Sequence, residues 1–251
     1  MFAQVWKAYV KLGEIMISGG ARQASAIDGL KADPTMFDYS KYCENRDPKI
    51  EFLGVFDTVS GGHGAAEIAQ RLRLNAGEVQ PNVKHAVQLL AIDETRDFFK
   101  PILWTGVKDQ TRRSFEQIWM PGVHSDVGGA YKTRHLGNLA LLTMIDRVIA
   151  RTSLGFNLAQ CRKRLQVHPS GGEVLRIHDE FTPPWRVISK PSPRAIDSGL
   201  PQTIHPFAKQ MLKMPVYFKT ETNHRPYLLT PDFSEMKEAK EFLSGKFKSN
   251  C

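Results

Sequence analysis

The sequence predicts an α/β protein with a mostly parallel sheet, because strand-like and helix-like patterns alternate along residues 48–150. Residues 49–56 and 115–120 are short apolar runs bounded by proline or glycine, which is typical of buried strands. Residues 136–150 place apolar side chains at helical spacing. We expect residues 48–150 to be the best-defined α/β core of a single domain that spans residues 1–251.

The segments outside these runs carry weaker patterns. Residues 2–17 and 65–74 suit helices, and the apolar run at 84–92 suits a strand or a helix. From about residue 168 onward, frequent prolines exclude long regular elements. We expect a loop-rich, proline-rich C-terminal part with short strands, followed by a charged helix at 234–247.

The chain is basic, with a net charge of +8 and a pI of about 9.4. The basic clusters are not interleaved with aromatic residues, and no nucleic-acid-binding motif is present, so we expect no nucleic-acid partner. Charge alone favours solvated helix faces. The alternative is attraction to anionic surfaces such as phospholipid headgroups.

The cysteines Cys43, Cys161 and Cys251 are far apart and form no C-x-x-C pair, which argues against a disulfide framework and a cysteine-based zinc site. No apolar run reaches the roughly 18 residues of a membrane span. Met1–Tyr9 lacks the pattern of a signal peptide. These features predict synthesis in the cytoplasm, without a cofactor or a metal.

Two candidate catalytic residues follow predicted strands. Asp57 comes directly after the strand at 49–56, and His124 follows the Pro121-Gly122 corner after the strand at 115–120. Active groups of parallel sheets lie at the carboxyl ends of the strands, so both residues are expected at one edge. There a carboxylate can orient an imidazole and stabilise its charged form. The composition around His124 predicts a strand end that opens into a loop.

Several alternatives remain open at this point. Asp57 can instead cap the turn through Thr58 and Ser60, and Asp126 is interpreted mainly as a turn residue, since in extended structure it would point away from His124. His85 and the Asp93-Glu94-Arg96 cluster are interpreted as an ion-pair network that holds a loop, with a second functional site as the alternative. A metal site made of Asp57, His85, His124 and Asp126 is disfavoured, because their spacing has no ligand pattern.

No nucleophile is evident. The G-x-S-x-G elbow of serine hydrolases is absent, and the segments 16–20, 58–62 and 168–172 each lack its first glycine. Ser18 and Ser60 are the best local substitutes.

Three blocks of the sequence resemble the DUF2235 family of α/β-hydrolases, which includes Tle1-type phospholipase effectors of type VI secretion. They are Phe52–Val59 (FLGVFDTV), His85–Arg96 (HAVQLLAIDETR) and Ile118–Tyr131 (IWMPGVHSDVGGAY). The family versions read approximately GVWDTV, HALALDExR and WFPGVHSDVGGGY. Phe56 therefore replaces a tryptophan, and Ala130 replaces a glycine.

The resemblance implies a partial α/β-hydrolase-like fold in which Asp57 is the triad acid and His124 the triad histidine. The family's serine elbow would precede the segment matched by Gln4–Tyr9, so the resemblance implies an N-terminal truncation. It further implies a phospholipase A-like esterase that acts on lipid esters at a membrane surface and is exported without a signal peptide. Secretion-system or immunity proteins would be its partners. The alternatives are a catalytically inactive remnant that acts as a binding or structural protein, and a recruited Ser18 or Ser60.

Overall fold

The computed structural model describes residues 49–59, 77–105, 114–171, 174–178, 180–181, 185–188, 190–195, 202–212, 214–218 and 225–227. The chain divides into two compact units, residues 1–49 with 61–76 and residues 50–60 with 77–251. All elements described below belong to the second unit. The helices predicted at 2–17, 65–74 and 234–247 lie outside the described residues.

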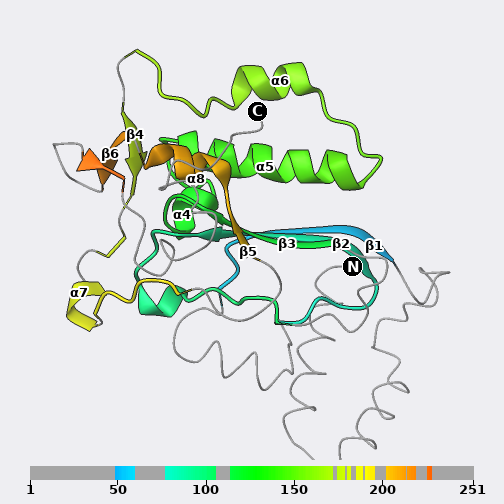
Figure 1. Cartoon of the computed structure of the whole chain (residues 1–251), viewed down its shortest axis with the longest axis horizontal. Coiled ribbons are helices and arrows are strands. Elements are labelled where there is room, and N and C mark those ends of the chain that lie inside the picture. Colours follow the sequence, from blue (N-terminus) through cyan, green and yellow to red (C-terminus); the bar gives the residue numbers. More distant parts are fainter. Residues whose placement is uncertain are drawn as a thin grey trace, which may run out of the picture. The chain divides into compact units, whose positions relative to one another are not determined.

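A four-stranded parallel sheet is the centre of this unit (Figure 1). The strands β1 (Ile50–Phe56), β2 (Val83–Ala91), β3 (Ser114–Met120) and β5 (Gln202–Ile204) lie side by side in that order, and each neighbouring pair is parallel. The predicted α/β class with a mostly parallel sheet is confirmed. The apolar run at 84–92, for which the pattern allowed two structures, is a strand.

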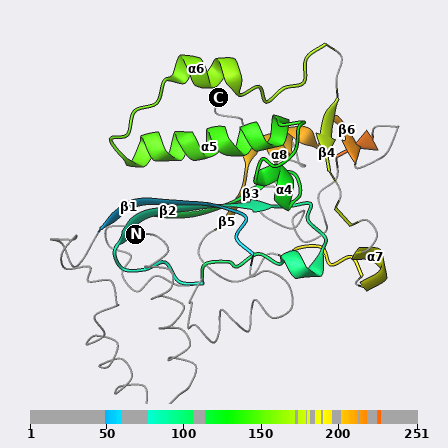
Figure 2. The same cartoon turned by 180° about the vertical axis from the view of Figure 1, so that it is seen from behind.

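The core forms on both faces of β2, because its side chains alternate between the faces and nearly all of them are buried. Val87, Leu89 and Ala91 belong to the cluster that includes Ala140 and Met144 of α5 (His135–Arg151). Leu90 and Ile92 instead join a separate cluster with Trp119 and Ile204. Helix α5 is the helix expected at 136–150, and it covers one face of the sheet (Figures 1 and 2).

The remaining elements are short. Helix α6 (Leu158–Arg164) lies farther from the sheet than α5 does in both views. A second sheet joins β4 (Leu175–Ile177), β6 (Pro215–Phe218) and β7 (Arg225–Pro226), and the other elements are η2 (Asp97–Phe99), α7 (Trp185–Ile188) and α8 (Pro206–Met211). No described helix combines the length and the apolar character that crossing a bilayer requires.

The segment around His124 is helical, so the prediction of an open loop was wrong. The Pro121-Gly122 corner, where Gly122 has a φ of 109°, leads into α4 (His124–Val127). The Asp126 carboxylate accepts a hydrogen bond from the backbone N–H of Val123 at 3.1 Å and so satisfies a donor at the start of the turn. This local cap favours the helical turn despite the neighbouring glycines.

Candidate active site

Asp57 and His124 meet at the carboxyl edge of the parallel sheet. Asp57 directly follows β1, and His124 opens α4 a few residues after β3. The Nδ1 atom of His124 lies 2.7 Å from Oδ2 of Asp57. Asp57 is fully buried, whereas 29% of the His124 side chain is exposed. With Nδ1 engaged by the carboxylate, Nε2 is the ring nitrogen left for exchange of a proton with another group.

Arg194 is a third member of this cluster, and the sequence patterns did not indicate it. Its guanidinium forms two hydrogen bonds with Asp57, one from Nη1 to Oδ1 and one from Nη2 to Oδ2 at 2.8 Å. The same group also donates to the carbonyl oxygens of Ala91 and Phe99 at 2.8 and 2.7 Å. Arg194 is almost completely buried, so this is an ion pair within the protein interior.

Asp57 is held in its ionised form. Burial opposes ionisation, but the hydrogen bonds from Arg194 and His124 outweigh it, and the pKa of Asp57 lies below its usual value. A further bond comes from the backbone N–H of Ala91 to Oδ1 at 2.8 Å. Asp57 also has a φ of 48°, in the left-handed region that aspartate tolerates better than most residues do.

A buried ion pair supports the other side of His124. Arg96 binds both carboxylate oxygens of Glu94, at 2.9 and 2.8 Å, and Glu94 also accepts a hydrogen bond from the backbone N–H of His124 at 3.3 Å. The Phe99 and His124 rings pack edge to face, with their centroids 5.2 Å apart. The Arg96 guanidinium lies 3.6 Å from the centre of the Phe99 ring. The pair therefore holds the 94–99 loop, as predicted, and through it the imidazole.

Asp126 belongs to a second histidine–aspartate pair. The Nδ1 atom of His178 lies 2.7 Å from Oδ1 of Asp126, and the His178 ring stacks on Tyr131 at 3.7 Å. Tyr131 donates a hydrogen bond to Glu180, and burial together with this carboxylate raises the pKa of Tyr131. The prediction that Asp126 stabilises a turn describes only part of what it does. The argument from extended structure was wrong, because α4 is helical.

Asp93 lies at the same edge of the sheet, and the pKa of its carboxyl is shifted in the opposite direction to that of Asp57. Oδ2 accepts hydrogen bonds from the backbone N–H of Gly122 at 2.7 Å and from the Tyr227 hydroxyl at 3.1 Å. Solvent reaches part of the residue, but protein surrounds the carboxyl densely, and this desolvation raises the pKa of Asp93 to about 7.

His85 is separate from these residues. It pairs with Phe52 near the amino end of the sheet, where its Nδ1 lies 2.7 Å from Oγ of Ser114. His85 is therefore not part of the Asp93–Arg96 network, and the disfavoured four-residue metal set is not brought together. Within the described ranges, no group of three or more His, Cys, Asp or Glu residues is placed to hold a metal.

The described residues do not test the two candidate nucleophiles. Ser18 and Ser60 lie outside the described residues. Ser170, in the third Ser-Gly-Gly segment, is exposed on the connection between α6 and β4. The described part of the site thus contains an imidazole hydrogen-bonded to a buried carboxylate.

Residues 1–147 match the family described as "T6SS, Phospholipase effector Tle1-like, catalytic domain". The matched segment is more than half of the chain and contains both Asp57 and His124. The chain belongs to this family. The searches among curated proteins and among solved structures gave no match. In this Tle1-like chain, Arg194 and His178 lie beyond the matched residues but contact Asp57 and Asp126 within them.

Proposed function

We propose that this Tle1-like chain provides the acid and the base of a serine-hydrolase-type lipid esterase, similar to a phospholipase A and built on an α/β-hydrolase-like sheet. The observation that carries the proposal is the 2.7 Å contact between His124 Nδ1 and the buried, ionised Asp57. Membership in a phospholipase effector family supports a lipid ester as the substrate. The family also supports secretion-system or immunity proteins as partners. We further propose that residues 1–251 form one catalytic domain, of which the family match covers residues 1–147.

In the proposed reaction, Nε2 of His124 takes the proton of a serine hydroxyl while the serine oxygen attacks the ester carbonyl carbon. The tetrahedral intermediate collapses to an acyl-enzyme, and His124 returns the proton to the departing alcohol oxygen. Water then repeats the sequence and releases the fatty acid. Asp57 stays ionised throughout and stabilises the imidazolium. The serine is proposed to lie outside this chain, because no segment in it has the G-x-S-x-G pattern.

A catalytically inactive binding protein is the second candidate, and one observation favours it. Arg194 occupies both oxygens of Asp57, which is also the arrangement of a purely structural buried ion pair. In that case the Asp57–His124 contact would stabilise the sheet edge without performing chemistry.

A hydrolysis assay on phospholipid vesicles distinguishes these candidates. The 251-residue chain is compared with a form that includes any in-frame G-x-S-x-G segment encoded upstream of Met1, and a fluorophosphonate probe identifies the reactive serine. We expect hydrolysis and labelling only when the elbow is present. We also expect His124→Ala and Asp57→Asn to lower kcat by about 10³-fold or more.

Ser60→Ala and Ser18→Ala are the matched serine controls, and they should leave the rate unchanged. Hydrolysis that survives His124→Ala would exclude the proposed base. If neither form hydrolyses any lipid ester, the binding-protein candidate is supported instead.

A further inference from the structure

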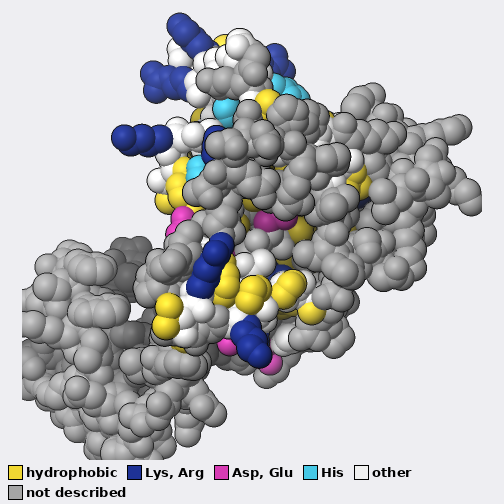
Figure 3. All heavy atoms as spheres, turned by 90° about the vertical axis from the view of Figure 1, so that its left-hand side faces the viewer, with side chains coloured by type: hydrophobic (Ala, Val, Ile, Leu, Met, Phe, Trp, Pro, Cys, Tyr) yellow, Lys and Arg dark blue, Asp and Glu magenta, His cyan; other side chains and the backbone are white. Residues whose placement is uncertain are grey.

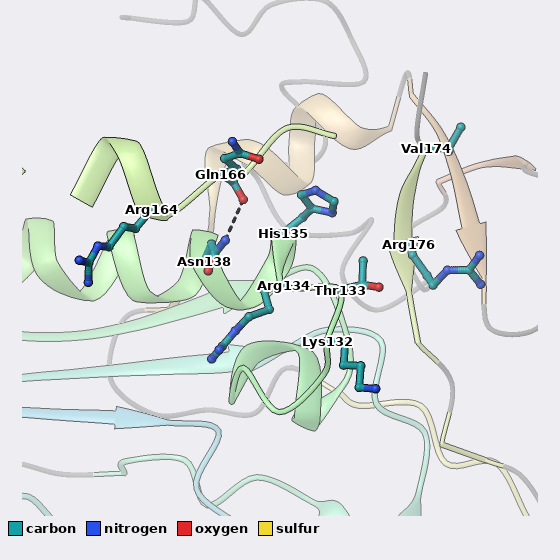
Figure 4. Close-up of a pocket in the computed structure, with 9 residues that line it drawn as sticks. All are labelled: Lys132, Thr133, Arg134, His135, Asn138, Arg164, Gln166, Val174 and Arg176. Carbon is teal, nitrogen blue, oxygen red and sulfur yellow. Dashed lines mark hydrogen bonds between the residues drawn. The ribbon is translucent and has the colours of Figure 1, made fainter. Parts of the chain in front are cut away.

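A basic cavity lies at the amino-terminal end of α5 (Figure 4), and neither Asp57 nor His124 lines it. Its volume is about 580 Å³, within the range of small-molecule sites. Four basic side chains line it, and they come from the connection before α5, from α6 and from β4: Lys132, Arg134, Arg164 and Arg176. None of the described lining residues is acidic.

Three of the four cations of this cavity have no carboxylate partner among the described residues. Among the described residues, no carboxylate forms an ion pair with Lys132, Arg134 or Arg164. Arg134 donates only to the backbone carbonyl of Gly129, at 3.1 Å. By contrast, the buried arginines at the sheet edge, Arg96 and Arg194, each face a carboxylate. A cavity of this kind attracts an anion.

Two features of α5 add donors at the same place. The helix is 17 residues long, and its N-cap residue, Arg134, gives it no side-chain cap, so the first-turn N–H groups and the helix dipole favour an anion. His135, which lines the cavity, has a buried Nδ1 atom without a hydrogen-bond partner. An anion in the cavity would give these groups the acceptor that the protein does not supply.

An apolar groove adjoins the basic cavity. Its volume is about 520 Å³, and it shares Arg134, Asn138 and Arg164 with the basic cavity. Phe56 and Leu141 line the groove, and they are 37% and 41% exposed, so both can contact a ligand there. Phe56 directly precedes Asp57, and the groove residue Val127 lies in the same helical turn as His124.

We propose that the basic cavity and the apolar groove together bind one anionic phospholipid, with its phosphate at Arg134 and Arg164, the two cations that line both, and an acyl chain along Phe56 and Leu141. The inference rests on the proposed lipid esterase and names its substrate class. Only an amphiphile uses a cation cluster and an apolar groove that share residues. A nucleic acid would need aromatic platforms among the cations, and the described lining of the cavity contains no Phe, Tyr or Trp. Figure 3 shows several lysine and arginine side chains at the upper end of one face of the molecule.

Vesicle co-sedimentation of the whole chain tests the basic cavity. Binding to vesicles of phosphatidylcholine with phosphatidylglycerol is compared with binding to phosphatidylcholine alone. The test variant is Lys132→Gln/Arg134→Gln/Arg164→Gln. The control, Arg162→Gln/Lys163→Gln/Lys190→Gln, removes the same charge from exposed residues that do not line the cavity.

We expect the cavity variant to lose at least about tenfold in affinity for phosphatidylglycerol vesicles and the control less than about threefold. Non-specific attraction to the vesicle surface would instead lower the affinity of both variants equally, since each basic residue near an anionic membrane contributes about equally to binding. Equal losses, or no loss in either variant, would overturn the proposal. Arg164→Gln alone, at an exposed helix end, should shift affinity in the same direction if the triple variant folds poorly.

The groove is tested with soluble ligands. Leu141→Gln should weaken binding of short-chain phosphatidylglycerol but not of inorganic phosphate, while Leu154→Gln, at an exposed position outside the groove, should change neither. If inorganic phosphate binds as tightly as the lipid, and Leu141→Gln has no effect, the site holds free phosphate and the lipid proposal is wrong. These assays measure binding without turnover, so a loss of binding is distinguishable from a loss of hydrolysis.

Discussion

Asp57 receives bonds from three segments that are far apart in the sequence: Ala91 at the end of β2, His124 in α4, and Arg194. The sequence predicted the contact between Asp57 and His124, because both residues follow strands of one parallel sheet. It could not predict Arg194, which lies 137 residues after Asp57 in a proline-rich segment without periodicity. The backbone bond from Ser192 to Thr95, at 2.7 Å, helps to fix that segment, and it has no local signal in the sequence.

Replacement of Arg194 tests its contribution to the site. Arg194→Met should destabilise the fold by about 3–5 kcal/mol, because it leaves the buried Asp57 carboxylate without its main positive partner. It should also raise the pKa of Asp57, since the group that favours ionisation is lost. Chemical denaturation measures the first effect.

The double variant Arg194→Met/Asp57→Asn is the control, because it removes the buried charge together with its partner. It should be less destabilised than the Arg194→Met single variant, which is a coupling that a double-mutant cycle measures. Additive losses would show that Arg194 stabilises the loop through Ala91 and Phe99 alone.

At the scale of elements, the helical periodicity predicted the bounds of α5 within about one residue at each end. The glycine-rich composition around His124 instead predicted a loop where the structure has the helical turn α4. The reason is that α4 is a single turn stabilised by contacts rather than by propensity: Asp126 caps it, and α5 packs directly against its end. A Cβ atom added to Gly137 of α5 would lie 2.7 Å from the Cα of Gly129. The close approach of these two glycines sets how α4 and His124 lie relative to α5.

Gly137→Ala should therefore destabilise the protein, by about 1–3 kcal/mol, even though alanine is the better helix former. The backbone at Gly129 cannot give way as a flexible side chain could, so α4 must shift. Thermal or chemical unfolding measures the loss, and the NMR signals of the His124 ring report the shift. Gly155→Ala is the control, because a Cβ there meets nothing within 4 Å. Equal stability of both variants would contradict this account of the α4–α5 contact.

At the scale of the whole described unit, the carboxyl edge of the sheet holds a carboxyl with a raised pKa, Asp93, and an imidazole with a lowered pKa, His205. Strand order explains why Asp57, Asp93 and His124 meet, since each follows a parallel strand, and this much is accessible from sequence. The strands β5, β4, β6 and β7 could not be predicted from the sequence, because strands of two to four residues are too short to show an alternation of apolar and polar residues. His205, just after β5, enters the interior in this way and accepts a hydrogen bond from the backbone N–H of Phe207 at 3.1 Å.

Asp93 and His205 should oppose each other in the pH dependence of stability. Burial raises the pKa of Asp93 from 3.8 to about 7, so its contribution is complete below pH 3.8 and is lost as the pH rises through 7. Burial, with Arg147 and Lys209 nearby, lowers the pKa of His205 from 6.5 to about 4, so its contribution is complete above pH 6.5 and is lost as the pH falls through 4. Between pH 4 and 6.5 the two slopes have opposite signs and similar size, about 1.4 kcal/mol for each pH unit, so they largely cancel.

Replacing one of these two residues should reveal the pH dependence of stability that the other contributes. Relative to the wild type, Asp93→Asn should lose stability as the pH falls from 6.5 to 4, because the His205 contribution is no longer offset. Relative to the wild type, His205→Gln should gain stability over the same interval, because the Asp93 contribution is no longer offset. Urea unfolding at several pH values measures both slopes, and each is compared with the slope of the wild type, because Asp57 and Glu94, whose pKa values are lowered, add the same loss of stability near pH 4 to all three proteins. Slopes parallel to that of the wild type in both variants would mean that neither group changes its protonation on unfolding, and the burial argument for this edge of the sheet would be wrong.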